Sequence, residues 1–453
     1  MSKDKKYEID MCNGPLLGKI LIFALPLMCS SVLQLLFNAA DIIVVGRFAG
    51  DNALAAVGST SSLINLLTNF FIGLSIGANV MVARFYGGKR YKDLTRTVHT
   101  AMLLSVYSGI LLTVIGCVMA KQILIWMDTP ADILPLATIY LRTYFLGMTA
   151  CMIYNFGSAI LRAVGDTKRP LYYLTAAGII NVVLNLIFVV YFHMSAAGVG
   201  LATAISQCVS AALIVRCMMK SESEIRLDLK ALKLHKDIIW SIVKIGLPAS
   251  LQGMLFSFSN VIIQSSVNSF GPIVVAGNSA ASNLEGFVYV AMNAFYQAAI
   301  SFTGQNLGAG RFERINKILY VSQGLVIIVG LILGNLEVFF GPTLLKLYTT
   351  SDLVVEAGMK RLVVISRLYA LCGMMDVMVG SLRGLGYSIQ PMIVSLIGAC
   401  GLRLFWIFTF FRMERFHSVD SLYLTYPVSW TITFLAHVVC FIIIRRRMKY
   451  NKG

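Results

Sequence analysis

Charged residues are scarce in this sequence. Of its 453 residues, only 13% are Asp, Glu, Lys or Arg, whereas 57% are apolar. Soluble domains usually contain about a quarter charged residues and about half apolar ones. The mean hydropathy of +0.77 reinforces the contrast. These values argue against a cytosolic enzyme, a DNA-binding protein and a secreted disulfide scaffold, and they indicate a polytopic membrane protein.

Several patterns typical of catalysis and metal binding are also missing. The chain has no Walker loop of the form GxxxxGK[ST] and no HExxH motif. ATP is therefore not expected as a direct energy source, and we expect neither an enzyme nor a cofactor. The nine cysteines form no CxxC pair and mostly stand singly in apolar segments. This usage predicts neither a disulfide framework nor a metal site.

Twelve long apolar segments recur along the chain. In lipid, only helices satisfy the backbone hydrogen bonds of segments this long, so we predict an all-α membrane protein with twelve transmembrane helices. The predicted helices cover residues 17–40, 53–82, 94–120, 136–161, 171–191, 196–218, 242–267, 274–302, 318–340, 362–382, 392–411 and 422–444.

Basic residues give the chain a net charge of +17, with 38 basic and 21 acidic side chains. In a soluble protein this excess would suggest nucleic acid. In a membrane protein, basic residues collect in cytoplasmic loops. The clusters alternate along the chain, so we predict that both termini are cytoplasmic and that nucleic acid is no partner. We also expect no removable signal peptide, because the polar N-terminal segment lacks a cleavage site. The basic segments are Lys3, Lys5 and Lys6, then 84–96, 168–169, 216–236, 311–317 and 445–449.

The two halves of the sequence resemble each other at a shift of about 221 residues. Segment 161–165 (LRAVG), followed by Pro170, matches segment 382–386 (LRGLG), followed by Pro391. Segment 87–91 (GGKRY) likewise matches 308–312 (GAGRF). Six helices in each half make the repeats parallel, and we predict two pseudo-symmetric six-helix bundles around a central cavity, as in transporters. The predicted domains are 1–220 and 237–453, joined by a cytoplasmic linker at 221–236.

These motifs carry a family resemblance over essentially the whole chain. One mark is the stretch that starts at Pro26 in the first predicted helix and continues through Asp41 to 45–47 (VGR). The paired LRxxG…P loops and segment 83–88 (ARFYGG) are the others. Together they resemble the multidrug and toxic compound extrusion (MATE) family of cation-coupled antiporters, in the bacterial branch containing DinF and MepA. The resemblance implies a multi-pass protein of the bacterial cytoplasmic membrane. It also implies export of amphipathic, cationic small molecules by alternating access, in exchange for H⁺ or Na⁺.

A buried acid in a membrane span is a functional candidate by default, and Asp41 is the first of them. Asn181 and Asn185 lie one helical turn apart and share a face. The resemblance implies that an Asn, an acid and a Thr form an ion-coupling cluster with Asp41, and this chain has Asn181, Asn185 and Thr203 at those positions. The single carboxylate could ligate Na⁺ or take up a proton. Alternatively, Asp41 lies at the outer mouth and pairs with Arg47.

Two further acids are predicted to line a substrate cavity. Glu285 has Asn283 nearby and suits an organic cation, although it could instead be a protonated acid bonded to a neighbouring helix. Asp376 has Asn155 as its repeat partner, and it either lines the cavity or pairs with Arg383.

Pro26 and Pro248 occupy matching places in the two halves. Proline removes a backbone hydrogen bond and kinks a helix, so both residues are predicted to act as hinges. We expect a monomer that acts on a small-molecule substrate within the lipid bilayer. A channel is disfavoured, because channels usually form their pore by oligomeric symmetry and this chain carries its own pseudo-symmetry. A flippase for lipid-linked oligosaccharide precursors is the alternative function, and it would require a more basic cavity.

Overall fold

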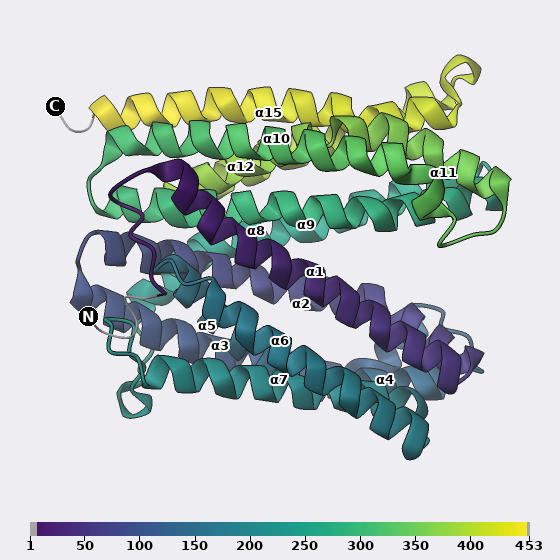
Figure 1. Cartoon of the computed structure of the whole chain (residues 1–453), viewed down its shortest axis with the longest axis horizontal. Coiled ribbons are helices and arrows are strands. Elements are labelled where there is room, and N and C mark those ends of the chain that lie inside the picture. The colour runs from purple at the N-terminus through teal and green to yellow at the C-terminus, as the bar shows by residue number, and fades with distance from the viewer. Residues whose placement is uncertain (1–6, 451–453) are drawn as a thin grey trace. The chain divides into compact units, whose positions relative to one another are not determined.

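The structure of this chain is a computed structural model that describes residues 7–450, so the predicted basic residues Lys3, Lys5 and Lys6 lie outside the described residues. The described residues are almost all helical and contain no strand. Figure 1 shows the helices coloured along the chain. The first half contains α1 (Leu16–Phe48), α2 (Asp51–Gly87), α3 (Tyr91–Trp126), α4 (Leu134–Leu146), α5 (Met148–Ala163), α6 (Lys168–Asn185), the π-helix η2 (Leu186–Tyr191) and α7 (Ser195–Met219).

The second half repeats this order. It contains α8 (Lys236–Asn268), α9 (Pro272–Gly308), α10 (Phe312–Leu345), α11 (Asp352–Ile365), α12 (Ala370–Gly384), α13 (Ile389–Ser395), the π-helix η5 (Leu396–Gly401), α14 (Leu402–Phe408) and α15 (Val419–Tyr450). Short 3₁₀ turns are η3 (Leu229–Ala231), η4 (Ser366–Leu368), η6 (Phe410–Arg412) and η7 (Glu414–Phe416).

Helix lengths agree between the halves. Both α1 and α8 have 33 residues, and both α2 and α9 have 37. The pair α4 and α5 is bent by 44°, and the corresponding pair from α11 to α12 is bent by 45°. Counting each bent pair as one span gives six helices per half. The predicted all-α fold of two repeated halves is confirmed.

The twelve helices counted in this way are not equally apolar. Among the described residues, nine helices are long and apolar enough to cross a membrane, or up to eleven if each bent pair counts as one. The predicted span at 274–302 lies in α9, which is absent from that set although it has 37 residues. This helix packs against α10, α11 and α12 (Figure 1). A helix surrounded by protein needs fewer lipid-facing apolar residues, and α9 carries several amides and Glu285.

The predicted span at 136–161 is not one straight helix. It consists of α4 and α5, which meet at Gly147. A Cβ atom at Gly147 would lie 2.7 Å from the Cα atom of Ala204 on α7. Glycine therefore allows α7 to approach the bend closely.

Pro26 and Pro248 lie inside helices that continue through them, since neither α1 nor α8 ends at its proline. The chain forms two compact units, and it passes from one unit to the other inside both α1 and α8. Unit 1 comprises the described residues up to Met11 and Cys29–Ser250, and unit 2 comprises Cys12–Met28 and the residues from Leu251 onwards. One change of unit falls between Met11 and Cys12, before α1, and the two changes inside helices each come two residues after a proline. The domain boundaries expected at 220 and 237 follow chain order and stay a prediction.

Candidate functional site

Three helices of unit 1 bring the predicted ion-coupling residues together. Asp41 lies on α1, Asn181 and Asn185 lie on α6, and Thr203 lies on α7. The Asn185 side-chain amide donates to Asp41 Oδ1 at 2.5 Å and to Asn181 Oδ1 at 3.2 Å. The Asn181 amide in turn donates to Thr203 Oγ1 at 3.3 Å. The four side chains, which we call the Asp41 cluster, therefore form one chain of hydrogen bonds.

The two asparagines of the Asp41 cluster are buried. Asn185 is fully buried and Asn181 is 5% exposed. Asp41 forms no ion pair with any residue that the structure describes, so the alternative pairing with Arg47 is not observed. Within the same described residues, Asn185 Oδ1 is buried and has no hydrogen-bond partner. One carboxylate without a cation and one vacant acceptor suit a proton or a small cation.

Local sequence explains how α1 and α6 come so close. Gly178 lies one turn before Asn181, and Phe37 lies one turn before Asp41. A Cβ atom on Gly178 would lie 1.9 Å from Cε2 of Phe37, so only glycine leaves room for that ring. The π-helix η2 begins directly after Asn185. Such π turns are frequent at functional sites.

Glu285 of unit 2 has a cationic partner. Both of its carboxylate oxygens accept hydrogen bonds from Arg361 on α11, at 2.8 and 2.7 Å. Glu285 is 3% exposed and Arg361 is 6% exposed. A bidentate, buried pair of this kind neutralises the carboxylate. The sequence analysis did not identify Arg361, and the predicted role of Glu285 in a substrate cavity stays a prediction.

Further polar groups complete the surroundings of Arg361. Its Nη1 donates to Asn278 Oδ1 at 2.8 Å, and the same oxygen accepts from the Tyr423 hydroxyl at 3.2 Å. The Asn278 amide donates to Gln264 Oε1 at 2.9 Å. The guanidinium also lies over the Tyr426 ring, 5.4 Å from its centre. A buried Glu usually needs a cationic partner, and this need was the only sequence signal for an Arg or Lys near Glu285. It could not single out Arg361, because that residue is 76 positions away in the chain.

Asp376 lies on α12 and is only partly buried. The predicted alternative partner, Arg383, instead donates to the Tyr296 hydroxyl at 2.5 Å and to Gln252 Oε1 at 2.8 Å. No ion pair joins Asp376 to another residue in the described range 7–450. Its carboxylate is thus less compensated than that of Glu285, and its cavity role stays a prediction.

The remaining predicted residues are scattered. The Asn155 amide donates to the Cys151 carbonyl of its own helix at 2.8 Å, and Asn283 is exposed on α9. The sequence analysis missed a further buried acid, Glu337, which is 6% exposed on α10. It falls inside the predicted span 318–340, where any acid should have been noticed.

No group of three His, Cys, Asp or Glu side chains among the described residues could hold a metal ion. The Asp41 cluster contains one carboxylate with amide and hydroxyl groups, whose hard oxygen atoms suit an alkali cation better than a transition metal.

These features define the class of protein. It is an all-helical, polytopic membrane protein built from two six-helix repeats, with polar clusters buried inside both. The MatE family description matches residues 26–187 and 248–409, which are most of the chain, and the two matches begin at Pro26 and Pro248. The chain belongs to the MatE family. The narrower placement in the branch containing DinF and MepA stays a prediction.

Curated relatives are similar over nearly the full length. The chain is 26% identical over 421 residues to the "Probable multidrug resistance protein YoeA" of Bacillus subtilis (strain 168), covering 91% of each chain. It is 28% identical over 402 residues to the "Probable multidrug resistance protein YpnP" of the same strain, covering 88% of each. A solved structure of MATE in complex with MaL6 has a TM-score of 0.91 at 20% identity, covering 99% of this chain and 100% of that one. That likeness shows the fold.

Proposed function

We propose that this chain is a secondary antiporter that exports amphipathic, cationic small molecules in exchange for H⁺ or Na⁺. It works by alternating access, as a monomer in the bacterial cytoplasmic membrane with both termini on the cytoplasmic side. The observation that carries the proposal is the Asp41 cluster, in which Asp41 is bonded by Asn185 and has no cationic partner among the described residues. The names of the Bacillus subtilis relatives support multidrug efflux as the substrate range.

The Asp41 cluster has the groups needed to bind and release one cation. In the structure Asn185 donates to the charged form of Asp41. Binding of a proton would turn Asp41 into a donor, for which the vacant Asn185 Oδ1 is a ready acceptor. Binding of Na⁺ would instead recruit oxygens of Asp41, Asn181 and Thr203. Either event removes the negative charge inside unit 1, and this change is the step that ion coupling requires.

The driving force depends on the charge of the exported molecule. One cation that moves down the membrane potential releases about 2.3 kcal/mol per 100 mV. Exchange of one monovalent ion for an uncharged substrate moves one net charge and supports a substrate gradient of roughly fortyfold at 100 mV, because about 1.4 kcal/mol corresponds to a tenfold ratio. Exchange of one monovalent ion for a monovalent cationic substrate moves no net charge, so the concentration gradient of the coupling ion alone drives it. With a single carboxylate, the Asp41 cluster suits one monovalent ion per cycle.

Charge also bears on the substrate. Glu285 is neutralised by Arg361, whereas Asp376 has no ion pair among the described residues. We therefore place Asp376, more than Glu285, among the groups that attract a cationic substrate. A flippase for lipid-linked oligosaccharide precursors is the second candidate, but it needs a cationic site for pyrophosphate, and the acids in these spans disfavour it.

Everted membrane vesicles test the proposal. The chain is expressed in an efflux-deficient bacterium, and uptake of a cationic fluorescent dye is followed with a pH gradient alone or with a Na⁺ gradient alone. Gradient-driven uptake by the wild type that is lost in Asp41→Asn is the expected result, and the effective gradient names the ion. Asn335→Ala is the matched control, because the exposed Asn335 amide bonds only its own helix. Gradient-driven uptake of wild-type size in Asp41→Asn would refute the assignment of the coupling site.

A further inference from the structure

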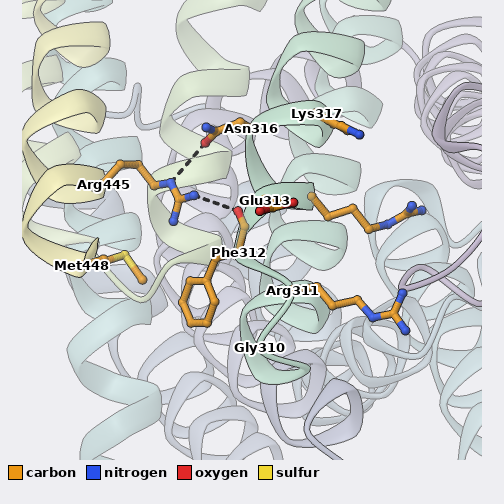
Figure 2. Close-up of a pocket in the computed structure, with 9 residues that line it drawn as sticks. Gly310, Arg311, Phe312, Glu313, Asn316, Lys317, Arg445 and Met448 are labelled. Atoms are coloured by element: carbon orange, nitrogen blue, oxygen red, sulfur yellow. Dashed lines mark hydrogen bonds between the residues drawn. The ribbon is translucent and has the colours of Figure 1, made fainter. Parts of the chain in front are cut away.

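A basic pocket lies in unit 2, where the turn between α9 and α10 meets the C-terminal end of α15 (Figure 2). Its volume is about 750 Å³. Four of its lining residues are cations, and Glu313 is the single acid among its lining residues. The cations are Arg311, Arg314, Lys317 and Arg445, which we call the basic pocket residues.

Arg445 is the buried part of the pocket. It is 7% exposed and crosses from α15 to α10, where Nε donates to Asn316 Oδ1 at 3.1 Å and Nη2 donates to the Phe312 carbonyl at 2.7 Å (Figure 2). Its third nitrogen, Nη1, is buried and has no hydrogen-bond partner in the described part of the chain. A buried guanidinium with an unused donor calls for an acceptor, because an unpaired buried polar group is costly.

The other cations lack anionic partners as well. Arg311 donates to the Cys12 carbonyl at 2.6 Å, and Arg314 donates to the carbonyls of Asn13 and Gly14 at 3.1 and 2.8 Å. These bonds orient the side chains but leave their charge uncompensated. Across residues 7–450, none of the basic pocket residues forms an ion pair. With Glu313 included, the pocket carries about three net positive charges.

The first-half repeat differs in how its arginines are paired. At the corresponding turn between α2 and α3, Arg90 pairs with Asp93 at 2.6 Å, and Arg96 pairs with Asp237 at 3.2 Å. At the repeat shift of 221 residues, Asp93 corresponds to Arg314. Lys92 likewise corresponds to Glu313, so the acid and the cation exchange places between the two turns. Arg90 and Arg96 are paired with acids in the first half, whereas the arginines of the second-half turn form no ion pair among the described residues.

We propose that the basic pocket residues bind a phosphate group. Guanidinium groups match phosphate oxygens in shape and charge, and several cations converge here on one space. The pocket lies at the ends of two candidate spans, α10 and α15, and Phe312 and Met448 add apolar surface to it. This position favours the head group of an anionic phospholipid over phosphate in solution, and the test below separates the two sources.

Native mass spectrometry of the purified full-length protein measures the proposed binding. The probes are dioleoyl phosphatidylglycerol and the zwitterionic dioleoyl phosphatidylcholine, and a separate arm follows the unfolding temperature with added inorganic phosphate. Two variants each remove one charge, Arg445→Gln and Lys317→Gln. Lys317 is exposed, so its variant remains informative if Arg445→Gln does not fold. The matched control is Lys92→Gln, an exposed lysine at the corresponding turn of the first half.

We expect phosphatidylglycerol to bind more tightly than phosphatidylcholine, and each pocket variant to weaken that binding about fivefold while Lys92→Gln leaves it unchanged. Stabilisation by inorganic phosphate that is lost in both pocket variants, without any preference among the lipids, would support the phosphate site and assign it to a soluble ligand. Equal binding of both lipids by all proteins, with no effect of phosphate, would overturn the proposal.

Discussion

Asn185 links the only carboxylate of the Asp41 cluster to the rest of the cluster. The side-chain amide nitrogen of Asn185 donates to both Asp41 and Asn181. The side-chain carbonyl oxygen of Asn185 has no hydrogen-bond partner among the described residues. The resemblance implied an acid at this position, and an amide there leaves Asp41 as the single titratable group of the Asp41 cluster. A second negative charge would have opposed the first in a site of this burial. In the proposed antiporter, the amide therefore leaves the Asp41 cluster with one exchangeable cation.

The ion pair between Glu285 and Arg361 gives a test of stability at the same scale. Arg361→Met leaves a buried carboxylate without a cation, and the expected loss is about 3–5 kcal/mol. Glu285→Leu combined with Arg361→Met removes both charges and is expected to be milder. The measurement is the unfolding temperature of the purified variants at one fixed heating rate. A double variant less stable than Arg361→Met alone would contradict the assignment of the loss to the unpaired carboxylate.

Some residues of the candidate site could be predicted from the sequence and others could not. Asn181 and Asn185 share a face because of their four-residue spacing, and the structure joins them by a hydrogen bond. Arg361 was not foreseen, because its contact with Glu285 depends on how α11 packs against α9. Helical spacing specifies neighbours within one helix, but it does not specify partners on another.

At the scale of helices, close packing of α1 on α6 depends on Gly178. A Cβ atom there would overlap the Phe37 ring, so Gly178→Ala is expected to displace the ring or α1. Overpacking of this kind costs about 1–3 kcal/mol. Since Phe37 precedes Asp41 by one turn, the displacement should also weaken ion-driven transport. The measurement is the initial rate of dye uptake in everted vesicles at equal protein amounts.

Two further variants make the Gly178 test specific. Gly58→Ala adds the same methyl group to α2 in open space, with no atom within 4 Å, and should leave transport unchanged. Gly178→Ala combined with Phe37→Leu should recover part of the lost rate, because the smaller side chain gives room to the methyl group. Wild-type transport by Gly178→Ala alone would contradict the importance of this contact.

The two prolines occupy the helices that change unit. Because Pro26 lacks a backbone N–H, α1 is weakened two residues before its chain passes from unit 2 to unit 1. If Pro26 is a hinge, Pro26→Ala restores that hydrogen bond, raises the unfolding temperature and slows transport. The matched control is Pro342→Ala, since Pro342 also lies inside a helix, α10, but away from any change of unit. Unchanged transport by Pro26→Ala would remove the hinge.

Helix prediction succeeded where apolar length decided it and failed where packing did. Every predicted span coincides with a helix of the structure. Helix α9 is less apolar than a lipid-facing helix because it packs against α10, α11 and α12. The bend at Gly147 was also unforeseen, since it depends on the approach of Ala204 from α7. A hydropathy pattern reports the surroundings averaged over a helix and contains little information about such contacts.

At the scale of the whole chain, the sequence repeat and the compact units divide the protein differently. The repeat follows chain order, with MatE matches at 26–187 and 248–409. The compact units do not follow chain order at α1 and α8. Cys12–Met28, which includes the first part of α1, belongs to unit 2, and the first part of α8, up to Ser250, belongs to unit 1. Sequence similarity identifies equivalent helices, but it does not show which unit each end of a helix joins.

The proposed orientation has a direct test in the linker between the halves. Lys230 and Lys233 are exposed around the short turn η3, in the segment predicted to be cytoplasmic. Trypsin should therefore cut the linker in everted vesicles and leave it intact in right-side-out vesicles, as seen by fragment size. Lys346 follows α10 at the other predicted side and should show the reverse behaviour. Cleavage of the linker from outside would invert the proposed topology.

The central claim is that Asp41 exchanges one cation for each exported substrate. Its most direct test uses purified protein in liposomes, where dye movement and movement of the coupling ion, H⁺ or Na⁺, are recorded together. We predict that a dye gradient drives the ion in the opposite direction in the wild type, and that Asp41→Asn abolishes this exchange while the protein remains folded. Dye-driven ion movement of wild-type size in Asp41→Asn would contradict the account.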